Sequence, residues 1–189
     1  MPNALIVSGG TKAAGLLAPI LQEASVTQVT AASTAGEARR LMISQDFDIC
    51  IVNAPLPDES GKDFAVSIAG KGISGILLLV PSEHFEEISC FVEDFGVLTV
   101  PKPLNRAFLW SALKMALAAH KKMRMMESEN QKLIRKIEDI RIIDRAKCLI
   151  VSHLSMTEPE AHKFIEKQAM DMRMTRRAVA EAILKTYEN

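Results

Sequence analysis

The longest uninterrupted pattern in the chain lies between about residues 105 and 153, where neither proline nor glycine occurs. An average helix has only ~11–12 residues, so this length predicts a coiled-coil helix rather than an ordinary one. Apolar residues, with one asparagine among them, recur there at alternating steps of three and four, which is the spacing of heptad positions a and d. These seam positions are Leu109, Ala112, Ala116, Ala119, Met123, Met126, Asn130, Leu133, Ile137 and Ile140.

The seam predicts a parallel homodimer through residues 109–140. Asn130 falls at an a position, where an amide pairs best with its own copy in a parallel dimer and fixes the register. A single amphipathic helix lying on its own domain is the alternative, because the alanine-rich first half of the seam can pack on a sheet. The residues expected to form the dimer contact are Met123, Met126, Asn130, Leu133, Ile137 and Ile140.

Short apolar runs alternate with helical patterns in the first 100 residues. Strands without polar alternation, joined by helices, predict an α/β fold with a parallel sheet covered on both faces. Ligand sites in such folds lie at the carboxyl ends of the strands. In the first helix we expect Leu16, Leu17, Ile20 and Leu21 to face inward. The expected strands are 4–7, 26–31, 48–53, 75–80 and 97–100, and the expected helices are 12–23, 34–44, 62–69 and 85–95.

The apolar pattern shifts to a new helix face after Ile140, which indicates new packing partners for the end of the long helix. Thr157 and Glu160 then form the sequence signature of a capping box, and Thr175 can cap a last helix. Three short helical segments can bury their apolar faces only by packing together as a small all-α bundle. The residues expected to face inward on the last helix are Ala178, Val179, Ala182 and Ile183.

Composition and charge are those of a globular protein, with 48% hydrophobic and 24% charged residues. The net charge of zero hides an asymmetry, because residues 1–120 hold 8 basic and 12 acidic side chains and the remainder holds 15 and 11. The basic tail suggests a polyanionic partner. Cys50, Cys90 and Cys148 are an odd number in apolar runs, so we expect reduced core residues of a cytoplasmic protein. No apolar run is long enough for a membrane span, and no signal peptide is evident.

The front part resembles the receiver domain of bacterial response regulators, which has a (βα)5 fold of the flavodoxin type. The resemblance rests on the loop after the first strand, the turn from Pro57 through Asp58 to Gly61, and Lys102 after the fifth strand. It implies phosphoryl transfer to an aspartate, with Mg²⁺ held by carboxylates and a lysine balancing the phosphate charge.

Most of the residues that such chemistry needs are replaced in this chain. Ser8 and Gly9 stand at the family's acidic pair, Asn53 at the phosphorylated aspartate, and Val80 and Thr99 at the two switch positions. Mg²⁺ prefers carboxylate oxygens and an amide is a poor nucleophile, so we predict a pseudo-receiver without metal, cofactor or phosphorylation. The remaining lysine, Lys102, is expected to hydrogen-bond the Asn53 side chain or nearby carbonyls.

The back part resembles the ANTAR domain, an RNA-binding antitermination module. The matching blocks are Arg145-Ala146-Lys147 with Leu149, Thr157-x-x-Glu160-Ala161, Ala169-Met170 with Arg173, and Val179-Ala180, while Cys148 and Ile150-Val151 depart from the family pattern. We expect the basic residues of this part to contact phosphates and loop bases. The candidates are Arg145, Lys147, Lys167, Arg173, Arg176 and Arg177.

Together these features predict a pseudo-receiver at residues 1–120, a dimerising coiled coil at 109–140 and an ANTAR domain at 141–189. The leading interpretation is a cytoplasmic antitermination regulator that binds hairpin loops in leader transcripts as a homodimer, with a protein or ligand acting on the pseudo-receiver. The alternative is an adaptor that binds protein and has lost RNA affinity. An enzyme is not expected, because no nucleophile, base or metal cluster converges in the sequence.

Overall fold

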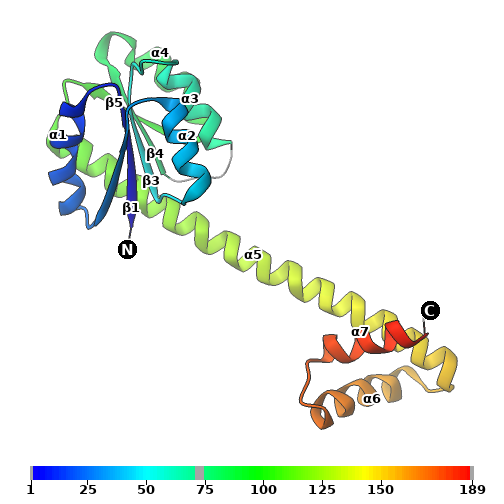
Figure 1. Cartoon of the computed structure of the whole chain (residues 1–189). Coiled ribbons are helices and arrows are strands. Elements are labelled where there is room, and N and C mark those ends of the chain that lie inside the picture. The colour runs from blue at the N-terminus through cyan, green and yellow to red at the C-terminus, as the bar shows by residue number, and fades with distance from the viewer. Residues whose placement is uncertain (1, 71–74, 188–189) are drawn as a thin grey trace. The chain divides into compact units, whose positions relative to one another are not determined.

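The structure is a computed structural model that describes residues 2–70 and 75–187, without the side chains of Thr11 and Lys12. It divides into two compact units, residues 1–124 and 125–189. Helix α5 (Arg106–Leu154) contributes to both units (Figure 1). Among the described helices, none is long and apolar enough to cross a membrane.

The first unit is a five-stranded sheet in the order β2-β1-β3-β4-β5, and every neighbouring pair of strands is parallel. This confirms the predicted receiver-type (βα)5 fold. The strands are β1 (Asn3–Ser8), β2 (Gln28–Ala32), β3 (Ile49–Asn53), β4 (Gly75–Pro81) and β5 (Val97–Lys102). The helices that alternate with them are α1 (Thr11–Glu23), α2 (Ala35–Ser44), α3 (Gly61–Ala69) and α4 (Phe85–Val92), with short 3₁₀ turns η1 (Ser82–His84) and η2 (Glu93–Phe95).

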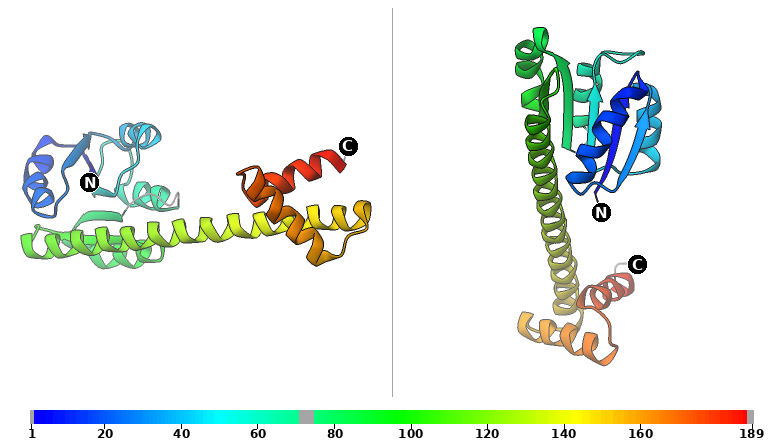
Figure 2. Two further views of the ribbon diagram at one scale, coloured as in Figure 1. Left: turned by 90° about the horizontal axis from the view of Figure 1, so that it is seen from below. Right: turned by 90° about the vertical axis from the view of Figure 1, so that its left-hand side faces the viewer.

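Helices cover both faces of the sheet, as the continuous apolar strands require (Figure 2). One face packs against α1 and the beginning of α5, with Leu17 and Leu109 fully buried between the layers. The other face packs against α2, α3 and α4, and Phe64 of α3 is fully buried there. The strands therefore supply two cores from alternate side chains, and the loops at their ends are left for function.

Several side chains lie elsewhere than the sequence pattern indicated. Leu16 was expected inward but is 69% exposed, because it sits at the edge of the α1 stripe that contacts the sheet. Cys50 is buried as expected, whereas Cys90 on α4 and Cys148 on α5 are exposed on the outer faces of their helices. The predicted helix 85–95 ends at Val92 and continues only as the turn η2.

The second unit is a small bundle made by the end of α5, α6 (Glu158–Asp171) and α7 (Arg176–Tyr187). The predicted capping box of Thr157 and Glu160 is present, and the Ala178 backbone N–H donates to Thr175 Oγ1 at 3.2 Å. On α7 Ala182 was expected to face inward but is exposed, and Ala180 is buried instead. The buried face of α7 is therefore centred one residue position away from the predicted one. The bundle core is Ala146, Ile150, Ala161, Ile165, Ala169, Val179, Ala180 and Ile183.

Helix α5 changes its surroundings along its length. Leu109, Leu113 and Ala116 are buried against the sheet, so the first part of the predicted seam is occupied within its own unit. The contact is close, since a Cβ on Gly75 would lie 2.9 Å from the carbonyl oxygen of Ala116. Every residue from 121 to 138 is exposed. The apolar seam from Met123 onward is therefore accessible on a helix whose beginning is anchored.

Candidate functional site

The carboxyl ends of β1, β3 and β5 bring together the residues predicted to replace a phosphorylation site. Ser8 is paired in register with Asn53, and Lys102 ends β5 two strands further along the sheet. Gly9 follows β1 in the same group. All four line a hollow of about 410 Å³, which is completed by Gly10, Ala13, Ala54 and Pro55.

A short hydrogen-bonded chain organises this hollow. The Asn53 side-chain amide donates to Ser8 Oγ at 3.0 Å, and Ser8 Oγ donates to the Gly10 carbonyl at 3.1 Å. Lys102 Nζ donates to the backbone carbonyl of Ala54, so of its two expected partners the carbonyl is the one observed. The polar groups are neutral except for the lysine.

The charge of Lys102 is the dominant electrostatic feature of the hollow. Partial burial lowers the pKa of Lys102, and among the described residues no carboxylate acts on it to raise that pKa again. The residues that line the hollow carry no carboxylate, and the described part of the chain holds no group of three or more His, Cys, Asp or Glu residues arranged for a metal. A hard divalent cation prefers oxygen ligands that bear charge, so this arrangement fits an anion better than Mg²⁺.

The two predicted switch positions lie away from this polar group. Val80 is fully buried near the end of β4. Thr99 on β5 donates from Oγ1 to Ser89 Oγ on α4 at 2.8 Å. Neither residue is among those that line the hollow around Lys102.

The loop after β3 contains contacts that the sequence did not reveal. The Asp58 carboxylate accepts from the backbone N–H groups of Ala35 and Gly36, both at 2.9 Å, and these bonds lower the pKa of Asp58. The next residue, Glu59, forms an ion pair with Arg39 of α2. The Pro-Asp turn is thus attached to the N-terminus of α2, where the helix dipole favours a carboxylate.

Gly9, at the position where the resemblance to receivers leads us to expect an acid, lies close to the loop after β3. A Cβ on Gly9 would lie 2.8 Å from Cγ of Pro57, a ring atom with little freedom to move. Pro57 belongs to the loop that Asp58 attaches to α2. The packing between the two loops therefore leaves little room for a side chain at position 9.

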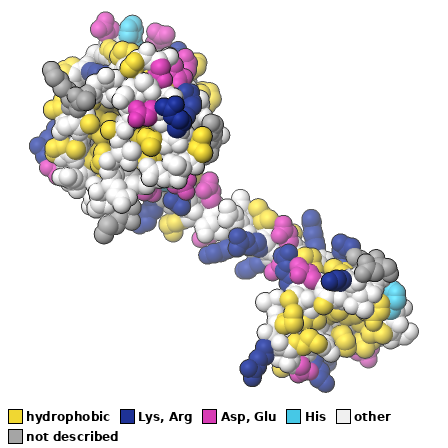
Figure 3. Space-filling view, in the orientation of Figure 1, with side chains coloured by type: hydrophobic (Ala, Val, Ile, Leu, Met, Phe, Trp, Pro, Cys, Tyr) yellow, Lys and Arg dark blue, Asp and Glu magenta, His cyan; other side chains and the backbone are white. Residues whose placement is uncertain are grey.

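In the second unit, the predicted RNA-contacting cations fall into separate places. Arg173, Arg176 and Arg177 lie around the turn between α6 and α7, and Lys167 is on the last turns of α6. Arg176 Nη1 is 3.1 Å from Glu166, and Arg177 Nη1 is 2.8 Å from Asp139. Hydrogen bonds to Asp139 and Glu181 raise the pKa of Arg177. Figure 3 shows apolar side chains gathered over the visible face of this unit, with basic side chains around it.

Lys147 and Arg145 lie on α5, away from that turn. Lys147 Nζ is 2.8 Å from Asp144 and 2.7 Å from Glu158, and these carboxylates raise the pKa of Lys147. Its side chain is only 15% exposed, so it holds α5 to the beginning of α6 in this structure. Arg145 is exposed and lies two residues earlier on the helix.

Solved structures similar to the first unit are receiver domains. One is the receiver domain of the putative Luxo repressor protein from Vibrio parahaemolyticus, which is 20% identical, with a TM-score of 0.60, covering 67% of this chain and 97% of that one. Another is the CheY-like receiver domain from Methanospirillum hungatei JF-1, which is 24% identical, with a TM-score of 0.55, covering 65% and 98%. The first unit therefore has the fold of a response-regulator receiver.

Residues 131–184 match the family described as the ANTAR domain. The chain is also 30% identical over 170 residues to the transcriptional regulatory protein PdtaR of Mycobacterium tuberculosis, covering 90% of this chain and 83% of that protein in two strains. The chain thus belongs to the family of response regulators that join a receiver to an ANTAR domain, a family of transcription antitermination regulators.

The contact between Gly9 and Pro57 makes a specific stability prediction. Gly9→Ala should lower the free energy of unfolding by about 1–3 kcal/mol, the usual cost of overpacking. In a Pro57→Ala background the same substitution should cost much less, because the atom it meets is gone. Thermal or urea unfolding of the two single variants and the double variant measures this coupling. Equal costs in both backgrounds would show that the two loops do not constrain each other.

Proposed function

We propose that this protein is a cytoplasmic, homodimeric regulator that binds hairpin-loop RNA in leader transcripts and thereby favours antitermination. The observation that carries the proposal is the ANTAR match at residues 131–184, on a bundle whose α6–α7 turn carries a cluster of arginines. The bound hairpin would compete with a terminator and let transcription continue. The receiver would act through a protein or ligand and not through a phosphate, and the protein would have no catalytic activity of its own.

Arg173 is the strongest candidate for RNA contact. It is exposed, and its φ of 53° lies in the left-handed region, which costs a side-chain-bearing residue about 1–2 kcal/mol. Glycine would relieve that cost at this turn. An arginine held there at the expense of backbone energy supports a role for its guanidinium outside the fold.

Arg173→Gly should therefore separate folding from function. We expect a melting temperature equal to or above that of the parent chain, together with weaker binding to a pool of RNA hairpins with randomised loops. Loss of one phosphate contact should also reduce the slope of log affinity against log salt by about 0.7–0.9. Fluorescence anisotropy at several salt concentrations gives both quantities.

Lys114→Ala is the matched control, because it removes an exposed cation of the receiver unit. It should leave RNA affinity and salt slope unchanged. Undiminished RNA binding by Arg173→Gly would remove Arg173 from the interface. Failure of the parent chain to bind any hairpin in the pool would favour the adaptor function instead.

The proposed dimer uses the part of α5 that the first unit leaves exposed. Four apolar side chains of the seam are each more than half exposed, namely Met126, Leu133, Ile137 and Ile140. A lone helix would leave this large apolar surface in contact with water. Asn130 lies in the middle of this seam. A second parallel copy would bury the apolar residues and pair the two asparagines.

Asn130→Ile should raise the thermal stability of the dimer while broadening its oligomeric state, because an apolar a residue packs better but specifies less. Light scattering at tens of micromolar should give a dimer for the parent chain and a mixture that includes higher oligomers for the variant. Ser128→Ala, an exposed position off the seam, is the control and should change neither property. A parent chain that remains monomeric would refute the dimer.

The receiver is proposed not to be phosphorylated. Incubation of the full chain with Mg²⁺ and acetyl phosphate should leave its mass unchanged, because Asn53 offers no carboxylate nucleophile and Ser8 and Gly9 offer no carboxylate to a metal. A receiver domain that has the phosphorylatable aspartate, treated in parallel, shows that the donor is active. A stable phosphoryl adduct on this chain, located by peptide mass mapping to the receiver, would contradict the proposal.

A further inference from the structure

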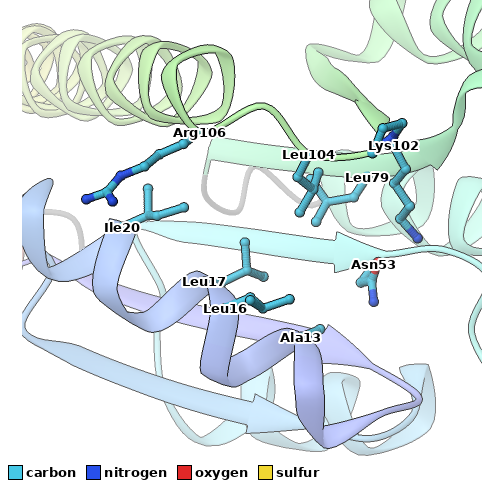
Figure 4. Close-up of a pocket in the computed structure, with 10 residues that line it drawn as sticks. Ala13, Leu16, Leu17, Ile20, Asn53, Leu79, Lys102, Leu104 and Arg106 are labelled. Atoms are coloured by element: carbon cyan, nitrogen blue, oxygen red, sulfur yellow. The ribbon is translucent and has the colours of Figure 1, made fainter.

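A second hollow adjoins the polar one at the carboxyl edge of the sheet. It has a volume of about 520 Å³ and lies between α1 and the segment that joins β5 to α5 (Figure 4). The two hollows share Ala13, Asn53 and Lys102 in their walls, so they are direct neighbours. Its volume falls within the ~300–1,000 Å³ of small-molecule sites in proteins.

The walls of the second hollow are apolar. Leu16 and Leu17 come from α1, Leu79 from β4, and Leu104 from the link into α5. Figure 4 shows these side chains between Ile20 at one end and the Asn53 side chain at the other. Leu16 lines this hollow while 69% exposed, which explains why it does not join the core.

The two ends of the hollow differ in charge. At one end Arg106 forms an ion pair with Glu23, so its charge is already balanced. At the other end Lys102 donates to the Ala54 carbonyl, and the described residues provide it with no ion-paired carboxylate. Partial burial makes this lone ammonium costly, and an anion placed beside it would recover the interaction that is missing.

We propose that the hollow binds a small aliphatic carboxylate, with its carboxylate at Lys102 and Asn53 and its hydrocarbon chain between Leu16, Leu17 and Leu104. A neutral molecule of the same shape would leave the lysine unbalanced. An inorganic anion would leave the apolar walls uncovered. A dicarboxylate would have to compete with Glu23 for Arg106.

The inference deepens the proposed function and rests on it only for the regulatory consequence, since it names the class of ligand that acts on the pseudo-receiver. The ligand would contact Leu104 and Arg106, which lead into and begin α5. Binding could therefore bias the position of the helix that carries the dimer seam, provided that the ligand has different affinities for the two positions.

Isothermal titration of the full-length protein with butanoate, hexanoate and octanoate tests the binding itself. Affinity should rise about fourfold for each added methylene until the hollow is filled. Hexanamide, which keeps the shape and lacks the charge, should bind at least about tenfold more weakly than hexanoate, as expected for loss of a charged hydrogen bond. Inorganic phosphate should bind weakly or not at all.

Two substitutions locate the site. Lys102→Gln should reduce hexanoate affinity about tenfold and abolish the preference for hexanoate over hexanamide. Ala13→Leu should reduce the affinity for both by narrowing the hollow. Lys114→Gln, a cation on α5 outside the lining, is the matched control and should bind as the parent does. The melting temperature of each variant is measured first to show that it is folded.

Affinity that is independent of chain length, equal binding of hexanoate and hexanamide, or no octanoate binding at millimolar concentration would overturn the inference. If Lys102→Gln fails to fold, the Ala13→Leu variant and the acid–amide comparison on the parent chain still decide it. If the parent chain binds the carboxylates but no RNA, the proposed function is contradicted and the proposed ligand site is still supported.

Discussion

Helix α5 packs against the sheet with its first turns and into the small bundle with its last turns, so both units depend on this helix. Leu109, Leu113 and Ala116 complete one of the two receiver cores, and the approach is so close that Gly75 leaves no room for a Cβ. The same helix then continues to Leu154 without glycine or proline and supplies Ala146 and Ile150 to the core of the bundle. One helix therefore belongs to two hydrophobic cores, and its exposed middle part is free to form a third contact with another chain.

The residues at the carboxyl edge of the sheet form one connected arrangement rather than a set of independent positions. Among the described residues that line the hollow, Asn53 and Ser8 are neutral and Lys102 alone carries a charge, and Lys102 donates to the backbone carbonyl of Ala54. A carboxylate at position 9 would have to displace Pro57, whose loop is attached to α2 by Asp58. An acidic residue introduced at position 9 would therefore have to disturb the packing of these two loops before it could bind a cation.

The sequence was sufficient for the fold because the strands are continuous apolar runs and the helix starts carry clear caps, such as Thr157 with Glu160. It failed where a helical stripe had to be centred to within one residue, as with Leu16 on α1 and Ala182 on α7, since a shift of one position turns a side chain by about 100° around the axis. The second hollow, which has aliphatic walls, was not predicted at all. Its lining comes from α1, β4 and the link into α5, and no local pattern records that these three segments meet.

An unbroken α5 also restricts how a signal could pass from the receiver to the seam. The second hollow ends at Arg106, whereas the exposed apolar seam begins at Met123, so a ligand in the hollow cannot touch the seam. Between them lie four to five turns of helix without a flexible residue, of which the early ones are fixed on the sheet. A ligand-induced change would have to move this segment as a rigid rod against the sheet, and the packing of Ala116 on Gly75 allows only small movements of that kind. In the proposed dimer Asn130 favours the one register that pairs it with its own copy, so a small displacement at the anchored end would change the seam only by disturbing that pairing.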